Sequence, residues 1–226
     1  PPVYPRIRGP QQPTDVHNTL LIGGQPQRPA RGQWFRTIED FKKNLTSGRM
    51  LETGDIPFYE DAGEWAAVAG DFDQAYADGL VGKCVRQLLF IRPDTIVIVD
   101  QLVPPEGGNL PDVQWLLQAP RESEIEGAAF TTTNGESWLR CRSLVPDALA
   151  PTVEATNVNT HRVTYRYTSD GPMNLVHVLE VGDGANPTDP IGAPEVSFGT
   201  EGAIEVTIGG ATYSFAMAPP FDVKKQ

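Results

Sequence analysis

Short apolar runs alternate with turn-forming residues along most of this chain, and this spacing restricts the fold more than any other feature. Glycine (22 residues) and proline (21 residues) together supply the turn positions in a chain of 226 residues. They are dense enough to interrupt long helices. Evenly spaced short strands are typical of an antiparallel sandwich or barrel. The sequence therefore predicts an all-β fold, and a length of 226 residues suits one domain over residues 1–226.

Three pairs of strands carry clear hairpin signals between them. The pairs are expected at residues 85–91 with 95–103, 128–133 with 136–142, and 203–208 with 211–217. In the first pair Pro93 presets a turn dihedral. In the second, Asn134-Gly135 suits a type I′ turn, in which both central residues take positive φ. Gly209-Gly210 has the same role in the third.

Other segments give coarser predictions. Residues 95–100 are β-branched and apolar on both faces, which is typical of a strand in the middle of a covered sheet. Residues 161–167 alternate in polarity, as a half-buried strand does. We expect a turn or two of helix near residues 38–45, a loop at 183–194, and a β meander or Greek key in the second half of the chain.

The charge of the chain limits its partners. The formal net charge is −11, from 29 acidic and 18 basic residues, so phosphate backbones and anionic membranes are repelled. We expect no nucleic-acid partner, and an acidic polysaccharide would need a local basic cluster. No window approaches the roughly 20 apolar residues of a membrane span, so no membrane partner is expected.

Cys84 and Cys141 are the two cysteines, and both fall inside expected strands. Two residues do not make a disulfide framework or a cysteine-rich zinc site. Two buried free thiols are the favoured interpretation, since free cysteine behaves as a small core residue, and a single bridge is the alternative.

His17 and Asn18 interrupt an apolar run near the start of the chain, which we predict to be a strand. They are the one polar pair in such a segment whose side chains could take part in catalysis or binding. The other two histidines are weaker candidates for a site. His177 shares a face with Leu175 and Leu179, which favours a core position over a ligand, and His161 is expected to be solvated.

Five segments in order resemble the C-terminal domain of heparinase II/III-like polysaccharide lyases. These segments are Asp15-Val16-His17-Asn18-Thr19-Leu20-Leu21-Ile22-Gly23-Gly24 followed by Gln27, Gly70-Asp71-Phe72 followed by Tyr76, Arg86-Gln87-Leu88-Leu89-Phe90-Ile91-Arg92-Pro93-Asp94, Ile96-Val97-Ile98-Val99-Asp100-Gln101-Leu102, and Val113-Gln114-Trp115-Leu116-Leu117. They cover the first half of the chain. The later strands match only in kind.

The resemblance implies a large antiparallel β-sandwich, without the N-terminal α-helical toroid that completes such enzymes. It also implies β-elimination on uronic-acid-containing glycans in a cleft between the two domains. The family's catalytic tyrosine and histidines come from the toroid and from sandwich sequence upstream of His17. We therefore expect this chain to be part of a longer protein, to have the toroid as its partner, and to be inactive alone. The family is usually periplasmic or secreted.

The resemblance also suggests site residues. In some members the histidine at the position of His17 helps to bind a structural zinc ion, so His17 is our candidate metal ligand. A structural hydrogen-bonding role and a direct substrate role are the alternatives. No cofactor is assigned to this chain alone. Asn18 and Arg8 are candidate substrate-binding residues, because arginine pairs well with a carboxylate. For Arg8, with Tyr4 and Arg6, ordinary surface charge on an edge strand is the alternative.

Four tryptophans, at positions 34, 65, 115 and 138, can stack on sugars or pack between sheets, and their dispersal along the chain favours packing. The competing class of function is a noncatalytic sandwich module that binds carbohydrate or packs against another domain. Fold class alone does not separate it from a lyase domain.

Overall fold

The computed structural model describes residues 14–27, 39, 54–146, 150–156, 160–184 and 192–226. Within them the chain forms sixteen β-strands and three short 3₁₀ helices. The strands are β1 (Leu20–Ile22), β2 (Asp55–Asp61), β3 (Trp65–Asp71), β4 (Lys83–Ile91), β5 (Thr95–Val103), β6 (Val113–Ala119), β7 (Glu124–Glu126), β8 (Ala129–Asn134), β9 (Ser137–Val145), β10 (Thr152–Ala155), β11 (His161–Tyr167), β12 (Met173–Asp183), β13 (Glu195–Phe198), β14 (Ile204–Ile208), β15 (Ala211–Phe215) and β16 (Val223–Lys225). The helices are η1 (Thr14–Val16), η2 (Asp73–Ala75) and η3 (Thr200–Gly202).

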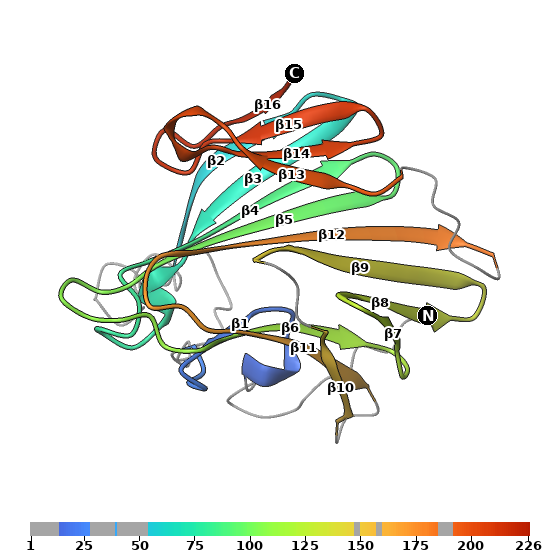
Figure 1. Cartoon of the computed structure of the whole chain (residues 1–226), viewed down its shortest axis with the longest axis horizontal. Helices are drawn as coiled ribbons and strands as arrows, with labels where there is room; N and C mark the ends of the chain where they lie inside the picture. Colours follow the sequence, from blue (N-terminus) through green and yellow to red (C-terminus); the bar gives the residue numbers. More distant parts are fainter. Residues whose placement is uncertain (1–13, 28–38, 40–53, 147–149, 157–159, 185–191) are drawn as a thin grey trace.

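Three antiparallel sheets lie in layers (Figure 1). The central sheet has eight strands in the order β2-β3-β4-β5-β12-β9-β8-β7. Below it in Figure 1 lies the lower sheet, β1-β6-β11-β10, and above it lies the upper sheet, β13-β14-β15-β16. The prediction of a large antiparallel β-sandwich is confirmed, with a third layer that the sequence pattern did not indicate.

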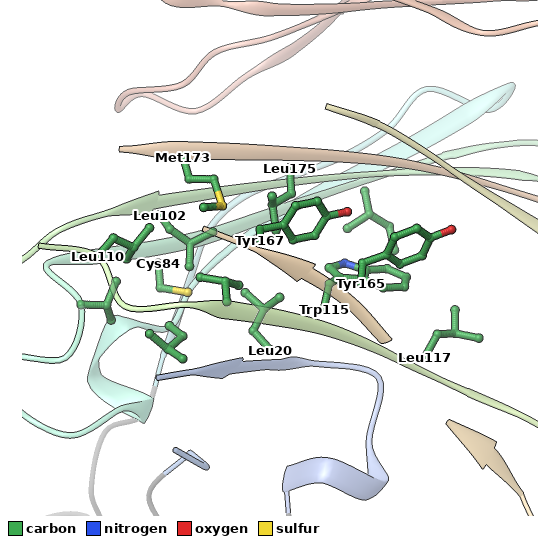
Figure 2. Packing of buried hydrophobic residues seen from close by; sticks show 14 of the residues in the cluster. Leu20, Cys84, Leu102, Leu110, Trp115, Leu117, Tyr165, Tyr167, Met173 and Leu175 are labelled. Atoms are coloured by element: carbon green, nitrogen blue, oxygen red, sulfur yellow. The ribbon is translucent and has the colours of Figure 1, made fainter. Parts of the chain in front are cut away.

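Side-chain alternation along the central strands fills a core on each side of the central sheet. On β12, Leu175 and Leu179 point into the lower core, while Val176 and Val178 point into the upper core. Figure 2 shows part of the lower core, to which the central sheet contributes Leu175 and the lower sheet contributes Trp115. As predicted, β5 lies in the middle of the central sheet, because a strand buried on both faces needs apolar side chains on both.

All three predicted hairpins are present. Gly209 and Gly210 both have positive φ, 58° and 80°, as a type I′ turn requires. The turn at Asn134-Gly135 is shifted by one residue from our prediction. Asn134 pairs with Ser137 as the last residue of β8, so the two central residues are Gly135 and Glu136, and of these only Gly135 has positive φ (68°).

Several other predictions can be compared with the structure. Cys84 and Cys141 are buried free thiols, as favoured. The tryptophans at 65, 115 and 138 are buried in packing positions, and Trp34 lies outside the described residues.

Only Glu39 of the predicted helix at 38–45 is described, and it is helical. The second half of the chain is not one meander: β13–β16 is a meander, but β10 and β11 join the lower sheet and β12 the central one.

Candidate functional site

His17 and Asn18 lie in a turn between η1 and β1, so our placement of them inside a strand was wrong. The backbone N–H of His17 donates to the Thr14 carbonyl at 3.1 Å, and the N–H of Thr19 donates to the His17 carbonyl at 3.1 Å. These local hydrogen bonds tighten the chain into a turn before β1 begins at Leu20. Both side chains are exposed.

Asn18 fastens this turn to two neighbouring strands. Its side-chain Oδ1 accepts a hydrogen bond from the backbone N–H of Gln118, on β6, at 2.8 Å. Its carbonyl accepts one from Nη1 of Arg86, on β4, at 3.3 Å. Asn18 therefore holds the turn against both the lower and the central sheet.

Arg86 and Asp100 form a bidentate ion pair beneath this turn. Nε of Arg86 lies 2.6 Å from Oδ1 of Asp100, and Nη2 lies 2.9 Å from Oδ2. The side chain of Asp100 is 1% exposed and that of Arg86 is 17% exposed. Burial opposes the charge on Arg86, but Asp100 outweighs this, so the pKa of Arg86 is raised. Both residues face each other across β4 and β5.

A second set of hydrogen bonds anchors the segment that follows the turn. The hydroxyl of Tyr76 donates to the Leu20 carbonyl at 2.9 Å. The Gln27 backbone N–H donates to Oγ1 of Thr14 at 2.9 Å, and its side-chain Nε2 donates to Oγ1 of Thr19 at 3.2 Å. Burial raises the pKa of Tyr76 far above its usual value, so this hydroxyl stays protonated.

These contacts explain much of the spaced pattern that carried the family resemblance. Tyr76, Arg86 and Asp100 are distant in sequence from Asn18 and Gln27. In the structure Tyr76 contacts Gln27 and Leu20, while Arg86 joins Asn18 to Asp100. Sequence reasoning treated Asn18 as a substrate contact and did not assign a role to the other four. Only the order of these residues along the chain could have indicated their roles. That order indicates a fold shared with the family, but it does not show which residues touch.

His177 is buried in the lower core, as predicted. Its ring stacks on Trp115 with centroids 4.0 Å apart, and its Nε2 lies 2.9 Å from the hydroxyl of Tyr167. That hydroxyl also lies 2.7 Å from Oγ of Ser143. Burial, and then the charge of Arg86, hold the pKa of His177 well below its usual value, so the ring is neutral. Figure 2 shows Trp115 and Tyr167 in this cluster, which solvent does not reach.

A groove of about 570 Å³ opens where the lower and central sheets separate at one end. Leu117, Gln118 and Pro120 line it from the end of β6 and the residues that follow. The β8–β9 hairpin and the last residues of β12 form its other wall. Gln118 connects this groove with the N-terminal turn, because its backbone N–H binds Asn18 and its Nε2 donates to the Asp15 carbonyl at 3.0 Å.

The lower face of the central sheet also carries an apolar hollow of about 230 Å³ on β2–β5. It is lined by Tyr59, Ala66, Ala67, Val68, Leu88, Phe90 and Ile96. Tyr59 is 68% exposed, and Leu88, Phe90 and Ile96 are half-buried. We call this set of residues the open apolar face.

Comparisons with known proteins agree with this architecture. A solved structure of heparinase III, the BT4657 gene product, aligns over 95% of this chain with a TM-score of 0.61 and 15% identity. A second heparinase III structure aligns over 88% with a TM-score of 0.58 and 18% identity. The fold is that of a heparinase-like β-sandwich. Heparan sulfate lyase HepC from Pedobacter heparinus aligns over 88% of the chain, with a TM-score of 0.50 and 14% identity.

The heparinase-like sandwich spans only part of each of these proteins: 30% and 29% of the two heparinase III chains and 35% of HepC. Identities of 18% and below establish a shared fold, and function has to be argued from the site. No model of a protein family matches the sequence, and neither does any curated protein.

The remaining site predictions concern ligands. Among the described residues, no group of three or more His, Cys, Asp and Glu side chains could hold a metal ion. His17 as a zinc ligand stays a prediction. Arg8, Tyr4 and Arg6 lie outside the described residues. No helix in the described ranges is both long and apolar enough to span a membrane.

Proposed function

We propose that this heparinase-like sandwich is the β-sandwich portion of a larger polysaccharide lyase that acts by β-elimination on uronic-acid-containing glycans. The observation that carries the proposal is the pair of coverages: 95% of this chain aligns with 30% of a heparinase III. Almost all of this chain aligns with the enzyme, but the aligned region is less than a third of the enzyme's own length. This chain is best explained as one part of the same architecture.

The described residues supply architecture and not the full chemistry. Elimination requires a base for the C5 proton, an acid for the departing glycosidic oxygen, and charge that neutralises the uronate. His177 is buried and neutral, and Arg86 is already paired with Asp100. We therefore propose that the main catalytic groups lie outside this chain, and that the isolated chain is inactive.

We propose that an α-helical toroid of the same protein packs on the sandwich, and that the cleft between them holds an acidic polysaccharide. The open apolar face supports a packing partner, because exposed apolar surface of this kind marks interaction sites. His17 and Asn18 are exposed on the turn held by β4 and β6. We propose that Asn18 contacts substrate there and that His17 joins zinc ligands from upstream residues. Arg8 stays a candidate substrate-binding residue. A periplasmic or secreted location fits a polymeric substrate.

Absorbance at about 235 nm tests the reaction class, because elimination leaves a conjugated double bond in the uronate product. Heparan-type, alginate-type and hyaluronan-type polymers are each incubated with the full-length gene product and with this chain alone. We expect product from the full-length protein on one polymer and none from this chain. Activity in this chain alone would show that its own residues suffice, and would refute the proposed division of roles.

The second candidate is a noncatalytic module that binds carbohydrate or packs against another domain. The observation that favours it is the open apolar face, which a noncatalytic module could also use to pack against another domain. Absence of any product from the full-length protein on all three polymers would favour this module over the lyase.

A further inference from the structure

His17 and Asn18 do not line the groove at the end of the lower and central sheets, although Gln118 adjoins both the groove and their turn. The apolar part of the lining, which we call the apolar base, includes Leu117, Leu139 and Val181. The size of the groove, about 570 Å³, is within the range of small-ligand pockets. Val181 is 39% exposed, so its side chain is accessible to a ligand.

The polar part of the lining consists mainly of hydroxyl and amide groups. Thr132 and Asn134 come from β8, Ser137 from β9, and Gln118 from β6. The side chain of Gln118 is held by the N-terminal turn, since its Nε2 donates to the Asp15 carbonyl, and its Oε1 is buried from solvent. Hydroxyl and amide groups both donate and accept hydrogen bonds, so this part of the lining suits a polar, uncharged ligand.

The charge of the lining restricts the ligand further. Asp94 and Asp183 are the acidic residues, and none of the described residues that line the groove is lysine, arginine or histidine. Ser137 donates from Oγ to Oδ1 of Asp183 at 2.7 Å, which keeps this carboxylate at the rim. An anionic ligand would meet two negative charges and no compensating cation.

We propose that this groove binds an uncharged sugar ring. A sugar ring presents C–H groups that fit the apolar part of the lining and hydroxyl groups that can hydrogen-bond to Asn134 and Asp183. The absence of cations among the described lining residues excludes a uronate or a sulfated ring as the preferred ligand. The proposed sugar site does not depend on lyase activity. The sugar-binding test can therefore fail while the elimination assay gives product, and sugar binding can be found in a protein that gives no product.

Nuclear magnetic resonance of the isotope-labelled chain tests the proposal directly. Four uncharged disaccharides serve as probes: cellobiose, lactose, mannobiose and diacetylchitobiose. We expect at least one of them, at millimolar concentration, to give saturable shifts at the backbone amides of Gln118, Asn134 and Val181. If none of the four shifts these amides, the proposal is refuted.

A second measurement tests the charge argument. The disaccharide that binds is compared with its uronic acid counterpart, and we expect the acid to bind roughly tenfold more weakly. Asp183→Asn should reduce that difference, while Glu195→Gln, which makes the same charge change on exposed β13, should not. Equal binding of the neutral and acidic sugars by the unmodified chain would overturn the assignment.

A groove-filling variant completes the test. Val181→Trp should abolish the sugar-induced shifts, because the indole occupies the space above the apolar base. Ile125→Trp is the matched control, since Ile125 is 44% exposed on β7 and does not line the groove. Persistent shifts in a folded Val181→Trp variant would place the ligand elsewhere. Should that variant not fold, the Asp183→Asn comparison still decides the question.

Discussion

At the scale of single residues, His177 makes the lower core sensitive to acid. Its pKa lies well below the ordinary value of 6.5, because burial and the charge of Arg86 disfavour the protonated ring. The unfolded chain therefore binds a proton near pH 6.5 that the folded chain does not bind. The stability contributed by the neutral ring is complete above pH 6.5 and is lost as the pH falls below it.

We expect the free energy of unfolding to fall between pH 7 and pH 5, with up to about 1.4 kcal/mol per pH unit arising from His177. Denaturant titrations at several pH values measure this slope. His177→Gln should be less stable at pH 7, because it loses the stacking on Trp115, but its slope should be smaller. His17→Gln is the exposed control and should keep the original slope. An unchanged slope in His177→Gln would contradict the prediction.

A second prediction at this scale concerns the buried ion pair beneath the first strand. Arg86→Met leaves the carboxylate of Asp100 buried and unpaired, so we expect a loss of about 3–5 kcal/mol in the free energy of unfolding. The double variant Arg86→Met/Asp100→Leu should recover much of this loss, because no buried charge remains. Chemical denaturation of both variants measures the difference. Equal destabilisation of the single and double variants would show that the ion pair is not the cause.

At the scale of elements, the pairing of β9 with β12 depends on a missing side chain. An ideal Cβ on Gly182 would lie 2.5 Å from Cζ2 of Trp138, since the indole covers this glycine. Gly182 and Trp138 are also direct partners in the ladder. The two residues therefore fit together only because one of them is glycine.

Gly182→Ala should destabilise the protein by about 1–3 kcal/mol, because the strand or the indole has to move. Gly171→Ala is the control: no atom lies within 4 Å of its ideal Cβ, and its φ is not positive. We expect that control to be neutral or slightly stabilising. Urea midpoints measure both variants, and equal midpoints would contradict this account of β9 and β12.

At the scale of the whole molecule, the central sheet is shared by both cores. Alternate residues of β12 enter the lower and upper cores, so loss of that strand would disrupt both layers. The prediction of one domain over residues 1–226 can therefore be tested by cooperativity. Trp115 reports on the lower core and Trp65 on the upper core.

In a variant that retains only Trp115, and in one that retains only Trp65, the fluorescence transition should coincide with the loss of backbone circular dichroism of that same variant. Leu175→Ala, in the lower core, should cost about 2–5 kcal/mol and shift both transitions together. Fluorescence and circular dichroism against guanidinium concentration are the measurements. Two separate midpoints in one variant, or a shift seen by Trp115 alone, would divide the chain into independent units.

The sequence by itself determined the features that depend on neighbouring residues. Gly209-Gly210 specified its turn because steric restrictions on φ and ψ act within the turn itself. Alternation along β11 specified its buried face, since side chains point to opposite sides of a strand. Even here the position of a turn was predicted only to within one residue. Asn134-Gly135 indicated a hairpin, but pairing between its two strands decided which residues occupy the turn.

Only the tertiary structure decided which distant residues meet. Asp15 and Arg162 lie 147 positions apart yet approach within 2.9 Å, and Asn18 reaches Gln118 across 100 positions. A periodic pattern shows the face on which a side chain lies but not the strand that packs against it. Such long-range packing produces the third layer, the turn that carries His17, and the groove between the lower and central sheets. Burial is set by what covers a residue and not by its neighbours in sequence.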